Sequence, residues 1–115
     1  MLKNISLVFG IIFAIVGIWG FFSPEVLGFS VNQLHSLVHL VVGLWLLWAA
    51  LKDEKQLPLA AQVIGVVYLI IAVLGFLKVQ FLVDSLVLND ADNWLHLIVG
   101  LILAYFGFMV KSRKA

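Results

Sequence analysis

The chain has 115 residues, of which 64% are hydrophobic and 11% are charged, and its formal net charge at pH 7 is +1. Its mean hydropathy is +1.19, whereas a soluble domain is about 45–50% apolar and about 25% charged. A chain this short has too little interior to bury so many apolar side chains, so we expect lipid to surround most of them. The small net charge supplies no basic patch for nucleic acid. The lack of cysteine excludes disulfides and thiolate metal sites.

Four apolar segments follow one another along the chain, and none has the period-two alternation of a membrane β-strand. A helix needs about 20 residues to cross about 30 Å of hydrocarbon, and each segment reaches or approaches that length. We therefore predict an all-α integral membrane protein, a bundle of four transmembrane helices. The segments are residues 5–22, 37–51, 57–77 and 94–110.

The boundaries of these segments carry helix signals. The first segment reads as a retained span, because its apolar core exceeds the roughly 7–15 residues of a signal peptide. The second and fourth become long enough if their helices begin a turn or two earlier, in the polar stretches 32–36 and 90–93, which supply N-caps. Pro58 stands where a first helical turn tolerates proline.

Basic residues predict the orientation. Only Lys78 falls on one side of a four-span chain, and the other six basic residues fall on the opposite side. By the positive-inside rule, we expect both termini to lie in the cytoplasm. We expect the membrane to be the inner (plasma) membrane. The six residues are Lys3, Lys52, Lys55, Lys111, Arg113 and Lys114.

The two halves of the sequence resemble each other. FGIIFAIVGIWGFF, from Phe9, aligns with IGVVYLIIAVLGFL, from Ile64, at a shift of 55 residues, and the following segments align at a shift of 57. We predict one domain, 1–115, built from two tandem helical hairpins, 1–56 and 57–115, related by a pseudo-two-fold axis along the membrane normal. The pairs matched at the second shift are Asn32 and Asn89, His39 and His96, and Gly43 and Gly100.

Small residues recur at helical spacing in the first, third and fourth spans. Such stripes let helix backbones approach closely, so we predict that they mark helix contacts. They are Gly10, Ala14 and Gly17; Ala61, Gly65, Ala72 and Gly75; and Gly100, Ala104 and Gly107.

Ionisable side chains lie just inside the predicted outer boundary of both halves. His35 and His39 are one helical turn apart, as are Asp92 and His96 at the matching positions. The pseudo-axis would bring these four side chains together. The simplest interpretation is an interhelical hydrogen-bond cluster in a structural or accessory protein, whose partners are the lipid bilayer and a second copy or another membrane protein.

Other interpretations of the cluster stay open, and so does the identity of any cofactor. His39 and His96 could be axial ligands of a haem, with Gly43 and Gly100 making room for the macrocycle. His35, His39, His96 and Asp92 could together bind zinc through three nitrogens and an oxygen. A carboxylate one turn away, as Asp92 is from His96, could also fix the tautomer of a metal-binding histidine. A proton or solute transporter subunit would need polar residues deeper in the spans, and the sequence has almost none there. The sequence has no Ser-His-Asp set, phosphate-binding loop or carboxylate pair with catalytic spacing, so we expect no enzymatic activity.

Two motifs carry a resemblance to a known family. HSLVHLVVGL, from His35, and DNWLHLIVG, from Asp92, resemble the two signatures of an uncharacterised family of small bacterial and archaeal membrane proteins, domain of unknown function 4383. The resemblance covers nearly the whole chain, although that family usually has asparagine where this chain has Ser36. It implies a four-span prokaryotic membrane protein with no assigned activity.

Overall fold

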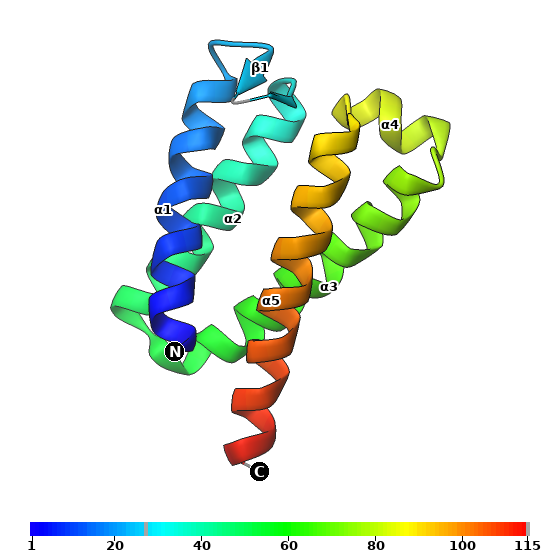
Figure 1. Cartoon of the computed structure of the whole chain (residues 1–115). Helices are drawn as coiled ribbons and strands as arrows, with labels where there is room; N and C mark the ends of the chain where they lie inside the picture. Colours follow the sequence, from blue (N-terminus) through cyan, green and yellow to red (C-terminus); the bar gives the residue numbers. More distant parts are fainter. Residues whose placement is uncertain (27, 115) are drawn as a thin grey trace.

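The computed structural model describes residues 1–26 and 28–114, with side chains described as far as Met109. In this part of the chain, four helices are long and apolar enough to cross a membrane (Figure 1). The all-α prediction and the four predicted segments are confirmed. The side chains of the basic residues after Val110 lie outside the described residues. The four helices are α1 (Leu2–Gly20), α2 (Gln33–Lys52), α3 (Leu57–Phe76) and α5 (Asp90–Lys114).

The polar stretches before the second and fourth segments begin helices, as predicted. Asn32 accepts a hydrogen bond on Oδ1 from the backbone N–H of His35 at 2.8 Å, which caps α2. Asn89 accepts the equivalent bond from the N–H of Asp92 at 2.9 Å, so the cap of α5 lies one residue before the predicted stretch 90–93. Each asparagine satisfies a donor that the first helical turn leaves free. Pro58 is the second residue of α3, where a missing N–H costs little.

The connections define two ends of the bundle. Both termini and the 3-10 turn η1 (Glu54–Gln56) lie at one end, called here the terminal end (Figure 1). The opposite end, called the distal end, carries an antiparallel ribbon of β1 (Glu25–Val26) and β2 (Phe29–Ser30) and the short helix α4 (Gln80–Leu86). Neither the ribbon nor α4 is predictable from the sequence, because elements this short have no measurable hydrophobic periodicity.

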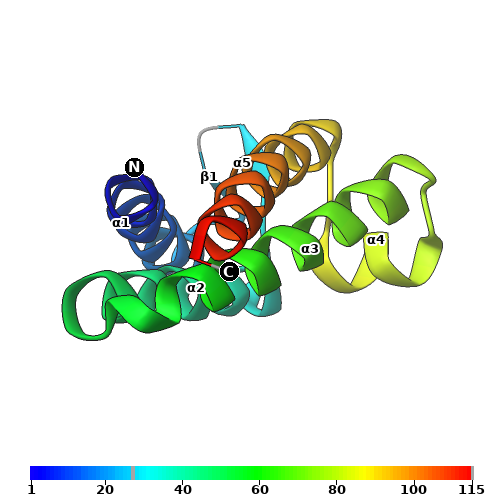
Figure 2. The same ribbon diagram turned by 90° about the horizontal axis from the view of Figure 1, so that it is seen from below.

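The helices pack as two pairs, α1 with α2 and α3 with α5, which lie side by side (Figure 2). Glycines permit the close approach in each pair. A Cβ added to Gly43 of α2 would lie 2.5 Å from the backbone nitrogen of Ala14, and one added to Gly65 of α3 would lie 2.5 Å from that of Ala104. Only a residue without a side chain fits these positions, so the predicted role of the small residues in helix contacts is confirmed.

The two helix pairs are also connected at the distal end. The amide Nδ2 of Asn32 donates to the carbonyl of Ser85 at 2.8 Å, which ties the first pair to the loop of the second. In return, Nδ2 of Asn89 donates to the carbonyl of Gly28 at 3.1 Å, in the loop of the first pair. Each capping asparagine therefore also fastens the opposite connection.

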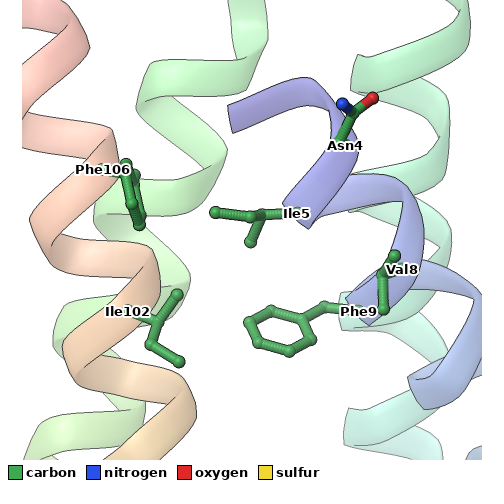
Figure 3. Close-up of a pocket in the computed structure, with 6 residues that line it drawn as sticks. All are labelled: Asn4, Ile5, Val8, Phe9, Ile102 and Phe106. Atoms are coloured by element: carbon green, nitrogen blue, oxygen red, sulfur yellow. The ribbon is translucent and has the colours of Figure 1, made fainter. Parts of the chain in front are cut away.

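The sides of the bundle are apolar. Ile15 is 57% exposed and Leu101 is 54% exposed, as expected where lipid is the solvent. Nearer the terminal end, a groove of about 390 Å³ lies between α1 and α5 (Figure 3). Such a groove fits lipid tails, because its lining is apolar apart from one asparagine. The lining residues are Asn4, Ile5, Val8, Phe9, Ile102 and Phe106.

Candidate metal centre

The three histidines of the chain meet inside the distal half of the bundle. His35 and His39 come from α2, and His96 comes from α5. Each offers one ring nitrogen, and these three nitrogens all lie within 4.8 Å of one another. Each side chain is at most 1% exposed. The structure thus brings together the three histidines that the sequence singled out.

The hydrogen bond of His35 fixes its tautomer. Its Nδ1 lies 3.0 Å from the carbonyl oxygen of Leu86, at the end of α4. A carbonyl only accepts hydrogen bonds, so Nδ1 carries the proton and Nε2 keeps a free lone pair. That Nε2 is buried and has no hydrogen-bond partner. Metal-binding histidines are usually prepared in this way, with one nitrogen held by the protein and the other free for the ion.

Asp92 has a different role from the one its position suggested. Its Oδ2 accepts a hydrogen bond from the backbone N–H of Asn89 at 3.0 Å, while Asn89 accepts one from the N–H of Asp92. This reciprocal pair is a capping box at the start of α5. Asp92 does not belong to the group of clustered ligand atoms, and Nδ1 of His96 has no hydrogen-bond partner. The expected tautomer-fixing bond between these two side chains is therefore absent.

The centre contains many buried polar atoms without partners. Neither nitrogen of His39 has a hydrogen-bond partner, so His39 and His96 are not joined by a hydrogen bond. Leaving a buried polar group unsatisfied costs about 1–3 kcal/mol, and such groups usually have an ion or ordered water as partner. The unpartnered atoms at the distal end are His35 Nε2, Ser36 Oγ, His39 Nδ1 and Nε2, Tyr68 Oη, Asp92 Oδ1, Asn93 Oδ1 and His96 Nδ1.

Aromatic rings from α1 and α3 border the histidines. The Phe13 ring lies 5.4 Å from that of His39, and the Tyr68 ring lies 5.0 Å from that of His96. Phe13 and Tyr68 also meet each other edge to face at 5.7 Å. The sequence analysis did not single out Tyr68. The signal was present, because the alignment of the two halves places this polar aromatic residue under Phe13 in the middle of an otherwise apolar span.

The surroundings leave little room for a haem. His35 lies beside the pair that would be axial ligands, with its ring centroid 4.4 Å from that of His39 and 5.5 Å from that of His96. The two glycines expected to accommodate a macrocycle face helix backbones instead. A Cβ on Gly43 would meet α1, and one on Gly100 would lie 3.0 Å from the backbone nitrogen of Leu69 in α3.

Towards the terminal end, the described side chains next to the centre are apolar. Leu46 and Leu103, seven residues after His39 and His96, are both fully buried in the core. Gln62, the polar residue of the third span, donates to the carbonyl of Gly107 at 3.1 Å. It belongs to a local contact between α3 and α5, so these residues provide no polar path from the histidines.

The fold and this centre define a helical membrane protein with a buried histidine cluster. Its chain belongs to the family described as domain of unknown function DUF4383, whose model matches residues 3–109. The resemblance noted from the two histidine motifs is thereby confirmed. No curated protein and no solved structure matches the chain.

Proposed function

We propose that this membrane protein binds one transition-metal ion through His35, His39 and His96. The observation that carries the proposal is the convergence of three buried imidazoles, each of which offers one ring nitrogen within 4.8 Å of those of the other two. Tetrahedral zinc with bonds of 2.0–2.1 Å needs ligand nitrogens about 3.3 Å apart. Small side-chain rotations are enough to bring the three nitrogens to that spacing.

Three imidazole nitrogens favour a metal ion that is intermediate between hard and soft. Imidazole suits zinc and copper, whereas magnesium and calcium prefer oxygen ligands. Three protein ligands leave one coordination position, which water or Tyr68 could fill. Asp92 provides nearby negative charge for the buried cation. The proposal is a binding role, and it includes no catalytic step.

A single ion accounts for more of the site than the two other interpretations do. A hydrogen-bond cluster leaves both nitrogens of His39 unsatisfied. A haem between His39 and His96 would require displacement of the His35 ring, which lies 4.4 Å from His39. An ion would use all three imidazoles after small side-chain rotations and would give their lone pairs a partner.

We also propose that the centre is formed by two tandem hairpin repeats, 1–56 and 57–115, in one domain. Equivalent contacts recur at the shifts found in the sequence. Asn32 donates to Ser85 and Asn89 donates to Gly28, and both asparagines and both acceptors are 57 residues apart. The distribution of lysine and arginine supports cytoplasmic termini, which puts the ion near the outer surface. We place the protein in the inner membrane of a prokaryote, as the family resemblance implies.

Metal analysis of the purified protein tests the ion site. The full chain should carry a tag without histidines, be extracted in detergent, and be supplied with zinc or copper, with haem in a separate preparation. We expect about one zinc or copper ion per chain. His39→Asn and His96→Asn should each lower the affinity by more than the 10- to 100-fold that losing an outer-shell partner costs. Tyr105→Phe changes an exposed residue of the same helix, α5, and is the matched control.

Circular dichroism shows whether each variant is folded. Ion content lost in folded histidine variants but retained in Tyr105→Phe supports the proposal. A wild-type chain that takes up neither metal refutes it. A haem absorption band from stoichiometric haem would favour the axial-ligand interpretation instead.

A further inference from the structure

The connection between α3 and α5 reaches the candidate ion site directly. Residues 78–87, called here the distal strap, contain α4 and end beside the histidines. Two of the strap's carbonyl groups accept hydrogen bonds from the first helix pair. Ser85 accepts from Asn32 at 2.8 Å, and Leu86 accepts from Nδ1 of His35 at 3.0 Å. The strap thus holds one of the three proposed ligands.

Both ends of the strap have an unfavourable backbone conformation. Lys78 has φ 57° and Val87 has φ 54°, so each is in the left-handed region. That region disfavours residues with a Cβ, and it disfavours a β-branched valine most. Among the described residues in the loop of the first hairpin, by contrast, the residue with positive φ is Gly28. The strap is therefore held in place against a local cost at both ends.

The contacts that offset this cost are concentrated at the histidines. Leu86 is 8% exposed, whereas Phe81, in the first turn of α4, is 82% exposed. Burial of Leu86 and the two hydrogen bonds fasten the end of the strap that touches the site. The rest of α4 contributes little to keeping it closed.

We propose that the distal strap is a gate to the ion site and that a bound ion holds it shut. This inference rests on the proposed ion binding. Coordination at Nε2 of His35 withdraws electron density from the ring, which makes Nδ1–H a stronger donor to Leu86. Coupling between two equilibria is reciprocal. A strap that is more stable in its closed position must therefore retain the ion longer, and loss of the ion must loosen the strap.

The position of the site supports entry from this side. Phe13 and Tyr68 border the histidines from α1 and α3, and Leu46 and Leu103 are fully buried towards the terminal end. Among the described residues, the strap is the element that is hydrogen-bonded to one of the three histidines and has a residue with positive φ at each end. Its opening would expose the nitrogens of His35 to the aqueous face.

Amide hydrogen exchange of the full chain in detergent, with and without zinc, tests the coupling. We expect zinc to slow exchange in residues 83–88 about 5-fold or more, because opening of the strap becomes rarer. Residues 54–56, in η1 at the terminal end, are the internal control and should not change.

Release of zinc to a chelator tests the gate from the other direction. Val87→Asn places a residue that tolerates the left-handed region at the strained position, and Val87→Gly removes the same penalty by a second route. Both should slow zinc release about 5-fold or more, given the roughly 1–2 kcal/mol cost of that conformation. Val79→Ala changes a residue of the strap that lies at φ −62°, and it neither relieves a left-handed residue nor adds an N-cap to α4, so it should leave release unchanged.

The outcomes separate the two proposals. Slower exchange on zinc binding together with slower release from both Val87 variants supports the gate. Stoichiometric zinc binding with unchanged exchange in residues 83–88, or with release from both Val87 variants as fast as from wild type, overturns the gate and leaves the ion site intact. A wild-type chain that binds no zinc or copper refutes the ion site and, with it, the gate.

Discussion

Replacement of Gly43 by alanine should separate α1 from α2 just below the histidines. The added Cβ would lie 2.5 Å from the nitrogen of Ala14 and 2.7 Å from the carbonyl oxygen of Gly10. Both atoms belong to the backbone, so no side-chain rotation can relieve the overlap. Ordinary contact begins at 3.4 Å, so α1 must move away by about 0.9 Å to avoid overpacking.

The matching glycine of the second hairpin gives a graded comparison. A Cβ on Gly100 would lie 3.0 Å from both the carbonyl oxygen of Gly65 and the nitrogen of Leu69, which requires a shift of only about 0.4 Å. Overpacking costs about 1–3 kcal/mol, and alanine regains up to about 1 kcal/mol over glycine in a helix. Gly43→Ala should therefore lower the free energy of unfolding by about 1–2 kcal/mol. Gly100→Ala should be nearly neutral.

Unfolding of the purified protein in mixed micelles, followed by circular dichroism as the fraction of denaturing detergent rises, measures both variants. Leu44→Ala is the control, because Leu44 is the neighbouring residue in α2 and is 53% exposed. It should unfold close to wild type. Gly43→Ala as stable as wild type, or more stable than Gly100→Ala, would refute the reasoning from backbone contact.

Two further predictions concern the orientation and the helix caps. A cysteine at Lys55 should react in intact cells only with membrane-permeant reagents, whereas one at Asp84 should react with impermeant reagents, and the reverse pattern would contradict cytoplasmic termini. Asn32→Ala and Asn89→Ala should each lower the free energy of unfolding by about 0.5–2 kcal/mol, because each removes an N-cap and a bond to the opposite loop. The same truncation at Leu34, which is 49% exposed, should cost clearly less, and equal losses at all three positions would argue against the caps.

The sequence was most informative where a local pattern has a single physical meaning. Long apolar runs in a chain with little charge specify membrane helices, and an asparagine before such a run specifies a cap. The meeting of His39 with His96 was predictable for a different reason. The two halves of the sequence align, and the pseudo-two-fold axis predicted from that alignment brings together two side chains that are far apart in the sequence.

The role of Asp92 was not settled by spacing, because one position satisfies two patterns. Asp92 is one helical turn before His96 and also three residues after the cap Asn89. In the structure the carboxylate of Asp92 accepts a hydrogen bond from the nearby backbone N–H of Asn89. The bond between His35 and Leu86 was beyond sequence reasoning altogether, since it depends on where a short helix 51 residues away ends.

The pairing of His35 with Asp92 at matched positions limits how such a site can arise. Two identical hairpins meeting on a two-fold axis can offer only an even number of imidazoles, so they provide two or four ligands but not three. On the proposed repeat, joining the hairpins in one chain lets one position remain histidine while its counterpart becomes the carboxylate of a capping box. A chain in which the two hairpins are fused can therefore provide three histidine ligands, whereas a symmetric dimer of identical hairpins cannot.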